Sequence, residues 1–252
     1  MEEKSSIEEL LYNSLLVQKE FFGDELFSDF ELEKINIDTK PASTFELKEE
    51  RQEIVSEKQE ENYIKTESLE EFNSQINSCM KCELGKTRNK FVFGVGNPNA
   101  DLMLIGEAPG AEEDAQGIPF VGRAGKLLTD ILRAINFSRD DVYIANILKC
   151  RPPNNRDPLP TERSTCFPYL DKQIELIKPK VILCLGRIAG NTLLNKSEPM
   201  SLLRGGNIFQ YQNIPVMVTY HPAALLRNPN WKRGCWEDVQ AVRKLYDELV
   251  KK

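Results

Sequence analysis

Four short apolar segments in the later part of the chain constrain its fold more than any other feature. Each is long enough for a strand, and two segments of helical composition, 122–137 and 160–178, separate the first three. Near-continuous apolar strands that alternate with helices are typical of a parallel sheet covered on both faces. We therefore expect an α/β protein, a three-layer α/β/α sandwich around a central four-stranded parallel sheet. The expected strands are residues 100–107, 141–148, 180–187 and 214–221.

The folded domain is expected to span residues 68–252. Ser68 is a residue type that favours helix N-caps, and Glu71 follows three positions later, which is the capping-box pattern. Apolar residues then recur at helical spacing and would share one face. These residues are Leu69, Phe72 and Ile76. We predict the first helix of the domain here and its last helix near 233–250.

Residues 1–67 differ in composition from the rest of the chain. They are rich in Glu, Lys, Ser and Gln and offer little apolar surface to bury, so we expect an acidic, largely disordered extension. One stretch, 7–22, carries apolar residues at near-helical spacing. It favours either a short helix that docks on a protein partner or a frayed helix without one.

The net charge of −6 is divided unevenly along the chain. Residues 1–70 hold 20 acidic and 8 basic side chains, whereas residues 71–252 hold 19 and 25. The larger part is basic enough to approach a polyanion. No apolar run approaches the ~20 residues that span a bilayer, and the N-terminus lacks the pattern of a signal peptide. We expect a cytoplasmic monomer with no membrane association.

Polar side chains stand at the ends of three expected strands. Glu107 ends the first, Asn146 lies near the end of the second, and His221, the single histidine, ends the fourth. The ligand crevice of an open parallel sheet lies beyond the carboxyl ends of its strands, so these side chains should converge. Taken singly, each has a structural alternative. Glu107 would cap a helix, Asn146 would satisfy a turn, and His221 would be a hydrogen-bonded structural residue before Pro222. Together at three strand ends, they favour a functional site.

The residue types at this expected site suit chemistry on a nucleobase. The Asn146 amide offers both a donor and an acceptor and can read the edge of a base. Phe120, in the loop after the first strand, would either stack on a planar ligand or fold back onto the core. Glu107 would orient a water, and His221 would stabilise negative charge on a leaving base. The set fits N-glycosidic hydrolysis of a flipped-out base.

Four of the six cysteines form a candidate metal site. Cys79 and Cys82 have C-x2-C spacing, and Cys150 and Cys166 follow later in the chain. Four thiolates suit either zinc or an iron-sulfur cluster, and their spacing does not choose between the two. Cys184 lies inside an apolar strand and is expected in the core, whereas Cys235 has no evident partner.

Three separated motifs, together with the four cysteines, resemble the iron-sulfur uracil-DNA glycosylases, family 4 of that superfamily. The motifs are GEAPG followed by EED and GIPFVGRAG, then NILKCRPPNNRDP, and then YHPAALLRNP. They occur in the order of the family, and the resemblance covers residues 68–252. It implies a monofunctional DNA glycosylase that hydrolyses the N-glycosidic bond of a flipped-out uracil and leaves an abasic site, the first step of base excision repair.

The resemblance implies a cofactor and a catalytic pair. Glu107 takes the position that activates water, and His221 faces the uracil O2, where negative charge accumulates. A [4Fe-4S] cluster would be held by four ligands. These are Cys79, Cys82, Cys150 and Cys166.

The resemblance also implies how uracil is recognised. Phe120 would stack on the base, Asn146 would bind its edge, and Ala108 belongs to a backbone turn against it. Glu113 corresponds to a position that crowds the C5 methyl of thymine and so excludes that base.

Contacts with the rest of the DNA are expected just after the histidine. A side chain among Leu225, Leu226 and Arg227 would wedge into the stack where the base has left. Two rival functions use the same fold: a non-catalytic DNA-binding module, and a replication accessory domain like that fused to some phage DNA polymerases. The intact set of Glu107, Asn146 and His221 favours the enzyme over the first rival.

Overall fold

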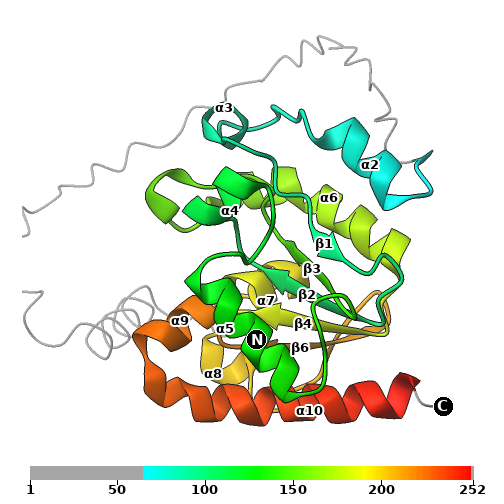
Figure 1. Ribbon diagram of the computed structural model, residues 1–252, viewed down its shortest axis with the longest axis vertical. Coiled ribbons are helices and arrows are strands. Elements are labelled where there is room, and N and C mark those ends of the chain that lie inside the picture. The colour runs from blue at the N-terminus through cyan, green and yellow to red at the C-terminus, as the bar shows by residue number, and fades with distance from the viewer. Residues whose placement is uncertain (1–64, 251–252) are drawn as a thin grey trace, which may run out of the picture. The chain divides into compact units, whose positions relative to one another are not determined.

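The computed structural model of the protein describes residues 65–250 (Figure 1). The expectations for the acidic extension fall on 1–64 and so lie outside the described residues. The helices are α2 (Leu69–Ile76), α3 (Leu84–Thr87), α4 (Ala111–Gln116), α5 (Arg123–Ala134), α6 (Pro160–Ile177), α7 (Arg187–Leu194), α8 (Met200–Leu203), α9 (Pro222–Arg227) and α10 (Lys232–Val250), with 3-10 turns η3 (Pro153–Asn155) and η4 (Pro229–Trp231). Within this range, no helix is long and apolar enough to cross a membrane.

The four expected strands form the parallel centre of one sheet. They are β2 (Leu102–Gly106), β3 (Tyr143–Asn146), β4 (Val181–Leu185) and β6 (Ile214–Thr219), in the order β3-β2-β4-β6. Every residue of β2, β3 and β4 is buried. This burial explains the near-continuous apolar runs, because both faces of a parallel sheet are covered.

The sheet is mixed and not purely parallel, which corrects the expectation of four strands. It has six strands, because β1 (Val95–Gly96) pairs antiparallel with β3 at one edge and β5 (Phe209–Tyr211) pairs antiparallel with β6 at the other. Both edge strands are too short to show a sequence period. A two-residue turn joins β5 to β6, and Gln212 and Asn213 both have positive φ there, as in tight hairpins.

Helices cover both faces of the sheet, which gives the expected three layers (Figure 1). Alternate residues of β2 face opposite ways: Met103 and Ile105 pack with α2, α6 and α7, whereas Leu102 and Leu104 pack with α5 and α10. The period of two along a strand is the cause of this division.

The first helix of the domain begins where the capping pattern predicts. The Ser68 Oγ accepts a hydrogen bond from the Glu71 N–H at 3.1 Å, and α2 buries the three apolar residues expected on its face. The Glu71 carboxylate reaches back to the N–H of Glu67 at 3.4 Å.

Candidate active site

The carboxyl ends of the central strands surround a cavity of about 350 Å³. Glu107 follows β2 directly, Asn146 ends β3, and His221 lies two residues after β6. Of the predicted residues, the cavity is lined by Glu107, Ala108, Glu113, Phe120, His221 and Arg227. Its remaining lining residues are Pro109, Gly110, Ala124, Pro152, Asn155, Arg156, Asp157 and Ala223. The topology therefore brings together side chains that lie more than 100 positions apart in the sequence.

The Asn146 side chain and the Phe120 ring both lie beside Gly106, and the Asn146 oxygen has no hydrogen-bond partner among the described residues. Asn146 itself is not among the residues that line the cavity. Asn146 is 2% exposed, and its Oδ1 is buried and unpartnered. Gly106 is its register partner on β2, and a Cβ on Gly106 would contact the Asn146 Oδ1 and come within 2.6 Å of the Phe120 ring. Only glycine leaves space for the amide and the ring to meet at this strand end. A buried acceptor without a donor costs free energy, which a ligand N–H would offset.

Phe120 is both a core residue and a wall of the cavity. It is 7% exposed and packs with the apolar residues on the α5 side of the sheet, yet its ring also lines the cavity. Its backbone has a φ of 55°, in the left-handed region that side chains other than glycine rarely adopt. The two alternatives for this residue, core packing and ligand stacking, are therefore compatible.

Glu113 fixes the loop that carries Phe120. Its Oε1 accepts hydrogen bonds from the N–H groups of Val121 (3.0 Å) and Gly122 (3.1 Å), and its Oε2 accepts one from the Gly110 N–H (3.1 Å). Three N–H donors hold the carboxylate as a rigid part of the cavity wall. The local sequence did not predict this bracing, because its partners lie on both sides of α4.

His221 is a neutral imidazole with a defined tautomer. It caps α9, and its Nδ1 accepts a hydrogen bond from the Ala223 N–H at 3.1 Å. Burial lowers the pKa of His221 to about 4, and the positive charge of Arg227 adds to this effect, while Glu113 opposes it. Because Nδ1 is an acceptor, the single proton lies on Nε2, which is free to donate.

Glu107 has the pKa of a general base that works near neutrality. Burial raises the pKa of Glu107 to about 7, and the negative charge of Asp157 raises it further, whereas Arg187 and Arg163 oppose the shift. Sequence reasoning did not single out these three charged residues. Asp157 lies in the quoted NILKCRPPNNRDP motif, but the two arginines are brought close to Glu107 only by the packing of α6 and α7.

The three residues of α9 that are expected to contact DNA are not equivalent. The structure corrects the expectation for Leu225: it is 1% exposed and packs in the core beneath α9, so its side chain is not available to DNA. Leu226 is 37% exposed, and Arg227 is exposed beside the cavity.

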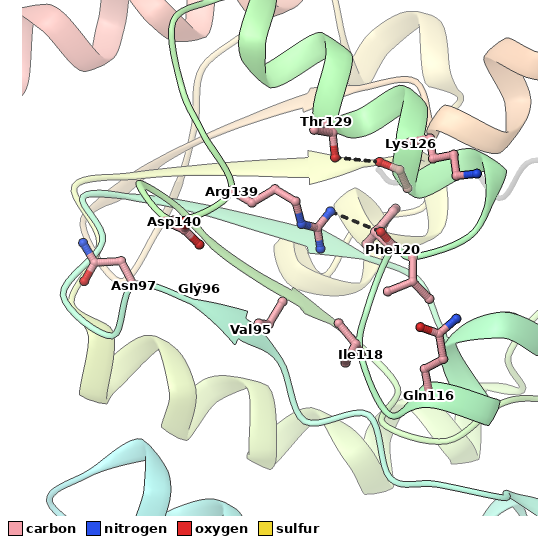
Figure 2. Close-up of a pocket in the computed structure, with 12 residues that line it drawn as sticks. Val95, Gly96, Asn97, Gln116, Ile118, Phe120, Lys126, Thr129, Arg139 and Asp140 are labelled. Carbon is pink, nitrogen blue, oxygen red and sulfur yellow. Dashed lines mark hydrogen bonds between the residues drawn. The ribbon is translucent and has the colours of Figure 1, made fainter.

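A larger groove, of about 870 Å³, lies on the other side of the Phe120 loop (Figure 2). It is bordered by β1, the loop before α5 and the side of α5 itself, and Arg139 projects into it toward the Phe120 carbonyl. None of the residues at the strand ends lines this groove. The smaller cavity is therefore the candidate active site.

The four candidate ligand cysteines gather on the α6 side of the sheet. Cys150 and Cys166 are buried, and Cys79 and Cys82 pack partly buried against the same apolar cluster. Three sulfurs receive hydrogen bonds: Cys150 from an Arg88 N–H (3.3 Å), Cys166 from the Lys149 main-chain N–H (3.4 Å) and Cys79 from the Tyr169 hydroxyl (3.2 Å).

The electrostatics show that these thiols interact with one another. Burial raises the pKa of Cys150, with further increases from Cys82 and Cys79 and opposition from Arg88. Burial likewise raises the pKa of Cys166 to about 12, against the charge of Lys149. Within residues 65–250, no three His, Cys, Asp or Glu side chains close around a single metal ion. Each thiolate of a four-iron cluster binds a different iron, and four thiols that accept N–H and O–H hydrogen bonds supply the donor chemistry of such a cluster.

Cys184 and Cys235 lie apart from this set. Cys184 is fully buried in β4, as expected for a core residue, and Cys235 is 3% exposed in α10.

Comparisons with known proteins place the chain in a family. The family model described as "Uracil DNA glycosylase superfamily" matches residues 93–245. The chain is 44% identical over 187 residues to the type-4 uracil-DNA glycosylase of Archaeoglobus fulgidus, covering 71% of this chain and 94% of the relative. It is 46% identical over 186 residues to that of Saccharolobus solfataricus, covering 70% and 86%.

A more distant match bears on the replication alternative. A DNA polymerase of Bacillus phage SP01 is 27% identical over 155 residues, which cover 61% of this chain but 17% of the polymerase. The extent of the family match and the coverage of the type-4 relatives settle the classification. This chain belongs to the uracil-DNA glycosylase superfamily.

Proposed function

We propose that this chain is a uracil-DNA glycosylase that hydrolyses the N-glycosidic bond of a uracil flipped out of DNA and leaves an abasic site. The observation that carries the proposal is the unpartnered Oδ1 of the buried Asn146 amide, which lies beside Gly106 together with the Phe120 ring that lines the strand-end cavity. An aromatic face beside an unpartnered acceptor is suited to a planar base that carries an N–H on its edge.

Recognition of uracil follows from hydrogen bonding and shape. Uracil has an N–H at position 3, which can donate to the Asn146 Oδ1, whereas cytosine has a bare nitrogen there. A site built around a buried acceptor rejects a base that leaves this acceptor unpaired. Glu113 is held by three N–H groups and cannot swing aside, which supports its role as the barrier to the thymine methyl.

The chemical step divides between two residues. Glu107, with its pKa near 7, accepts a proton from the water that attacks the sugar carbon. The Nε2–H of His221 donates to the uracil O2, where negative charge grows as the base departs. A neutral donor suits this task because its proton is held in place before the reaction begins, without the desolvation cost of a buried imidazolium.

The four cysteines are proposed to hold a [4Fe-4S] cluster. A bound cluster would supply a covalent cross-link between the segment after α2, the loop after β3 and α6. Its role in this proposal is structural, and no step of the hydrolysis involves it. Neighbouring cations favour an anionic thiolate set, because the charge of Arg88 lowers the pKa of Cys150 and the charge of Lys149 lowers the pKa of Cys166, against the effect of burial.

DNA outside the cavity is proposed to contact Leu226 and Arg227, with phosphates bound by nearby Lys and Arg side chains. Such contacts make affinity strongly dependent on salt. We expect a monofunctional enzyme, since none of the residues that line the cavity in the described part of the chain is a lysine that could act as a nucleophile for strand cleavage. The glycosylase domain is proposed to span 68–252, in a cytoplasmic monomer, with 1–67 as an extension that binds a protein partner.

Matched oligonucleotides that carry one uracil or one thymine test the proposal. After incubation, alkali cleaves any abasic site, and we expect scission only at uracil. Wild-type protein with its cluster intact by visible absorbance that cleaves neither strand would favour the non-catalytic DNA-binding module. Retention of replication proteins by immobilised 1–67 would add support for the accessory role.

A further inference from the structure

Arg139 contacts the Phe120 loop from a distant part of the chain. It lies between α5 and β3, outside the three motifs that carry the resemblance to glycosylases. Its guanidinium donates two hydrogen bonds to consecutive carbonyls, those of Pro119 (2.9 Å) and Phe120 (3.1 Å). Figure 2 shows the side chain directed across the groove toward this loop.

The backbone at Phe120 needs to be held by its surroundings. Its φ of 55° is strained for an aromatic residue, and such conformations persist only where neighbouring groups determine them. Gly125 packs directly against the Phe120 carbonyl, where a Cβ would collide with it. The carbonyl is therefore contacted both by Arg139 and by the first turn of α5.

Partial burial of a charged side chain costs desolvation free energy, which a neutral side chain in a purely structural contact would not cost. Burial lowers the pKa of Arg139, although the negative charge of Asp140 opposes this effect, and its two hydrogen-bond acceptors are neutral. What arginine supplies here is a rigid fork that binds two carbonyls at a fixed spacing, which a lysine ammonium does not reproduce.

The position of the Phe120 ring is what this fork determines. The ring shares the space beside Gly106 with the Asn146 Oδ1 and lies 5.5 Å from the His221 ring, so a small rotation of the loop would change how the three side chains are arranged. We propose that Arg139 is a positioning residue that sets the stacking ring of Phe120 for uracil. This inference rests on the proposed glycosylase function.

The test compares Arg139→Ala and Arg139→Lys with Arg133→Ala. Arg133 is an exposed arginine in the last turn of α5 that forms an ion pair with Asp130 on the same helix, so it is a matched control. Inhibition by free uracil and single-turnover rates on a uracil oligonucleotide are measured for each, with thermal unfolding as a check on the fold.

For Arg139→Ala we expect weaker inhibition by uracil, by about 10-fold or more, because two hydrogen bonds to a charged group are lost. Its rate should keep the wild-type pH midpoint, because Glu107 is untouched. Added guanidinium at millimolar concentration should restore part of the loss, since the groove beside the vacated position is open to solvent. Arg139→Lys should be inhibited by uracil more strongly than Arg139→Ala. On a logarithmic scale, however, it should regain less than half of the inhibition that Arg139→Ala loses.

Uracil inhibition equal to that of Arg133→Ala would overturn the inference. A loss that guanidinium does not restore would also overturn it, because it would assign Arg139 to general folding. A wild-type protein that neither binds uracil nor excises it would instead refute the proposed function.

Discussion

The rings of Phe120 and His221 lie 5.5 Å apart, with their planes tilted by 32°. One ring comes from the loop between α4 and α5 and the other from the N-cap of α9, so the surface that stacks on a base adjoins the group that stabilises its charge. A base seated against Phe120 would therefore present its carbonyl oxygen to the His221 Nε2–H. This arrangement leads to a prediction that separates the chemical role of His221 from its structural role.

His221→Asn should lose catalysis while it keeps most of the stability. The asparagine Oδ1 can accept the Ala223 N–H and so preserve the cap of α9, but it does not place a donor where Nε2 stands. We expect a fall in kcat of about 10²–10³. His221→Ala should lose the same catalysis and, in addition, ~1 kcal/mol of stability with the cap. Single-turnover rates and urea unfolding measure the two effects, and unchanged turnover in His221→Asn would reject the role.

Activity should rise with pH through the pKa of Glu107. The base must be deprotonated to accept a proton from water, and burial raises its pKa to about 7. Single-turnover rates should therefore increase from pH 5.5 and level off above about 8. His221, with its pKa lowered to about 4, stays neutral across this range and therefore adds no second pH-dependent change to the rate profile. Glu107→Gln should abolish the rise, and a wild-type profile that is flat from pH 5.5 to 8 would contradict the assignment.

The same shift predicts that Glu107→Gln stabilises the fold at high pH. The carboxyl binds its proton more tightly in the folded state, so stability falls as pH rises from the unfolded pKa near 4.5 to about 7. Above pH 7 the glutamine variant should be more stable, by up to about 3 kcal/mol, and below pH 4.5 the two proteins should be alike. Urea unfolding at pH 4.5 and 8 measures the difference. Equal stability at pH 8 would show that the ionised carboxylate is well solvated.

Gly106→Ala should damage recognition more than the fold. The added Cβ would contact the Asn146 Oδ1 and stand 2.6 Å from the Phe120 ring, so one of the two must move. Overpacking of this kind costs about 1–3 kcal/mol of stability. Because the displaced groups are the base-binding pair, inhibition by free uracil should weaken at least 10-fold. Wild-type uracil binding in this variant would mean that Asn146 and Phe120 do not meet the base.

Loss of one cluster cysteine should reduce stability before it affects chemistry. Cys150→Ser, purified without oxygen, should lack the visible absorbance of an iron-sulfur protein and give less folded protein, because three segments lose their common attachment. Cys235→Ala is the control, since Cys235 is equally buried but lies in α10, apart from the four. Full stability in Cys150→Ser would argue that no cluster ties these segments together.

The parts predicted from sequence are those with a strong local signal. The four central strands are continuous apolar runs, and Glu107, Asn146 and His221 stand at their ends, so topology alone brought them together. β1 and β5 escaped prediction because two or three residues carry no period. The arginines that lower the pKa of Glu107 were not predicted for another reason. Arg163 and Arg187 approach Glu107 only through helix packing.

The sequence alone did not show which of two adjacent leucines in α9 is buried and which is exposed. The two residues provide a matched pair of variants. Successive helical residues point about 100° apart, so one leucine can face the core while the next faces solvent. Leu225 is 1% exposed and Leu226 is 37% exposed. Leu225→Ala should therefore cost about 2–5 kcal/mol of stability and leave the rate at low temperature near wild type.

Leu226→Ala should do the reverse. Its stability should match the wild type, whereas excision from duplex DNA should slow, because no side chain would fill the space left by the flipped nucleotide. Excision from single strands, where no stack must be held open, should change little, so the ratio of duplex to single-strand rates measures the wedge. If that ratio is the same in Leu226→Ala and wild type, Leu226 does not enter the stack, and Arg227 becomes the side chain to replace next.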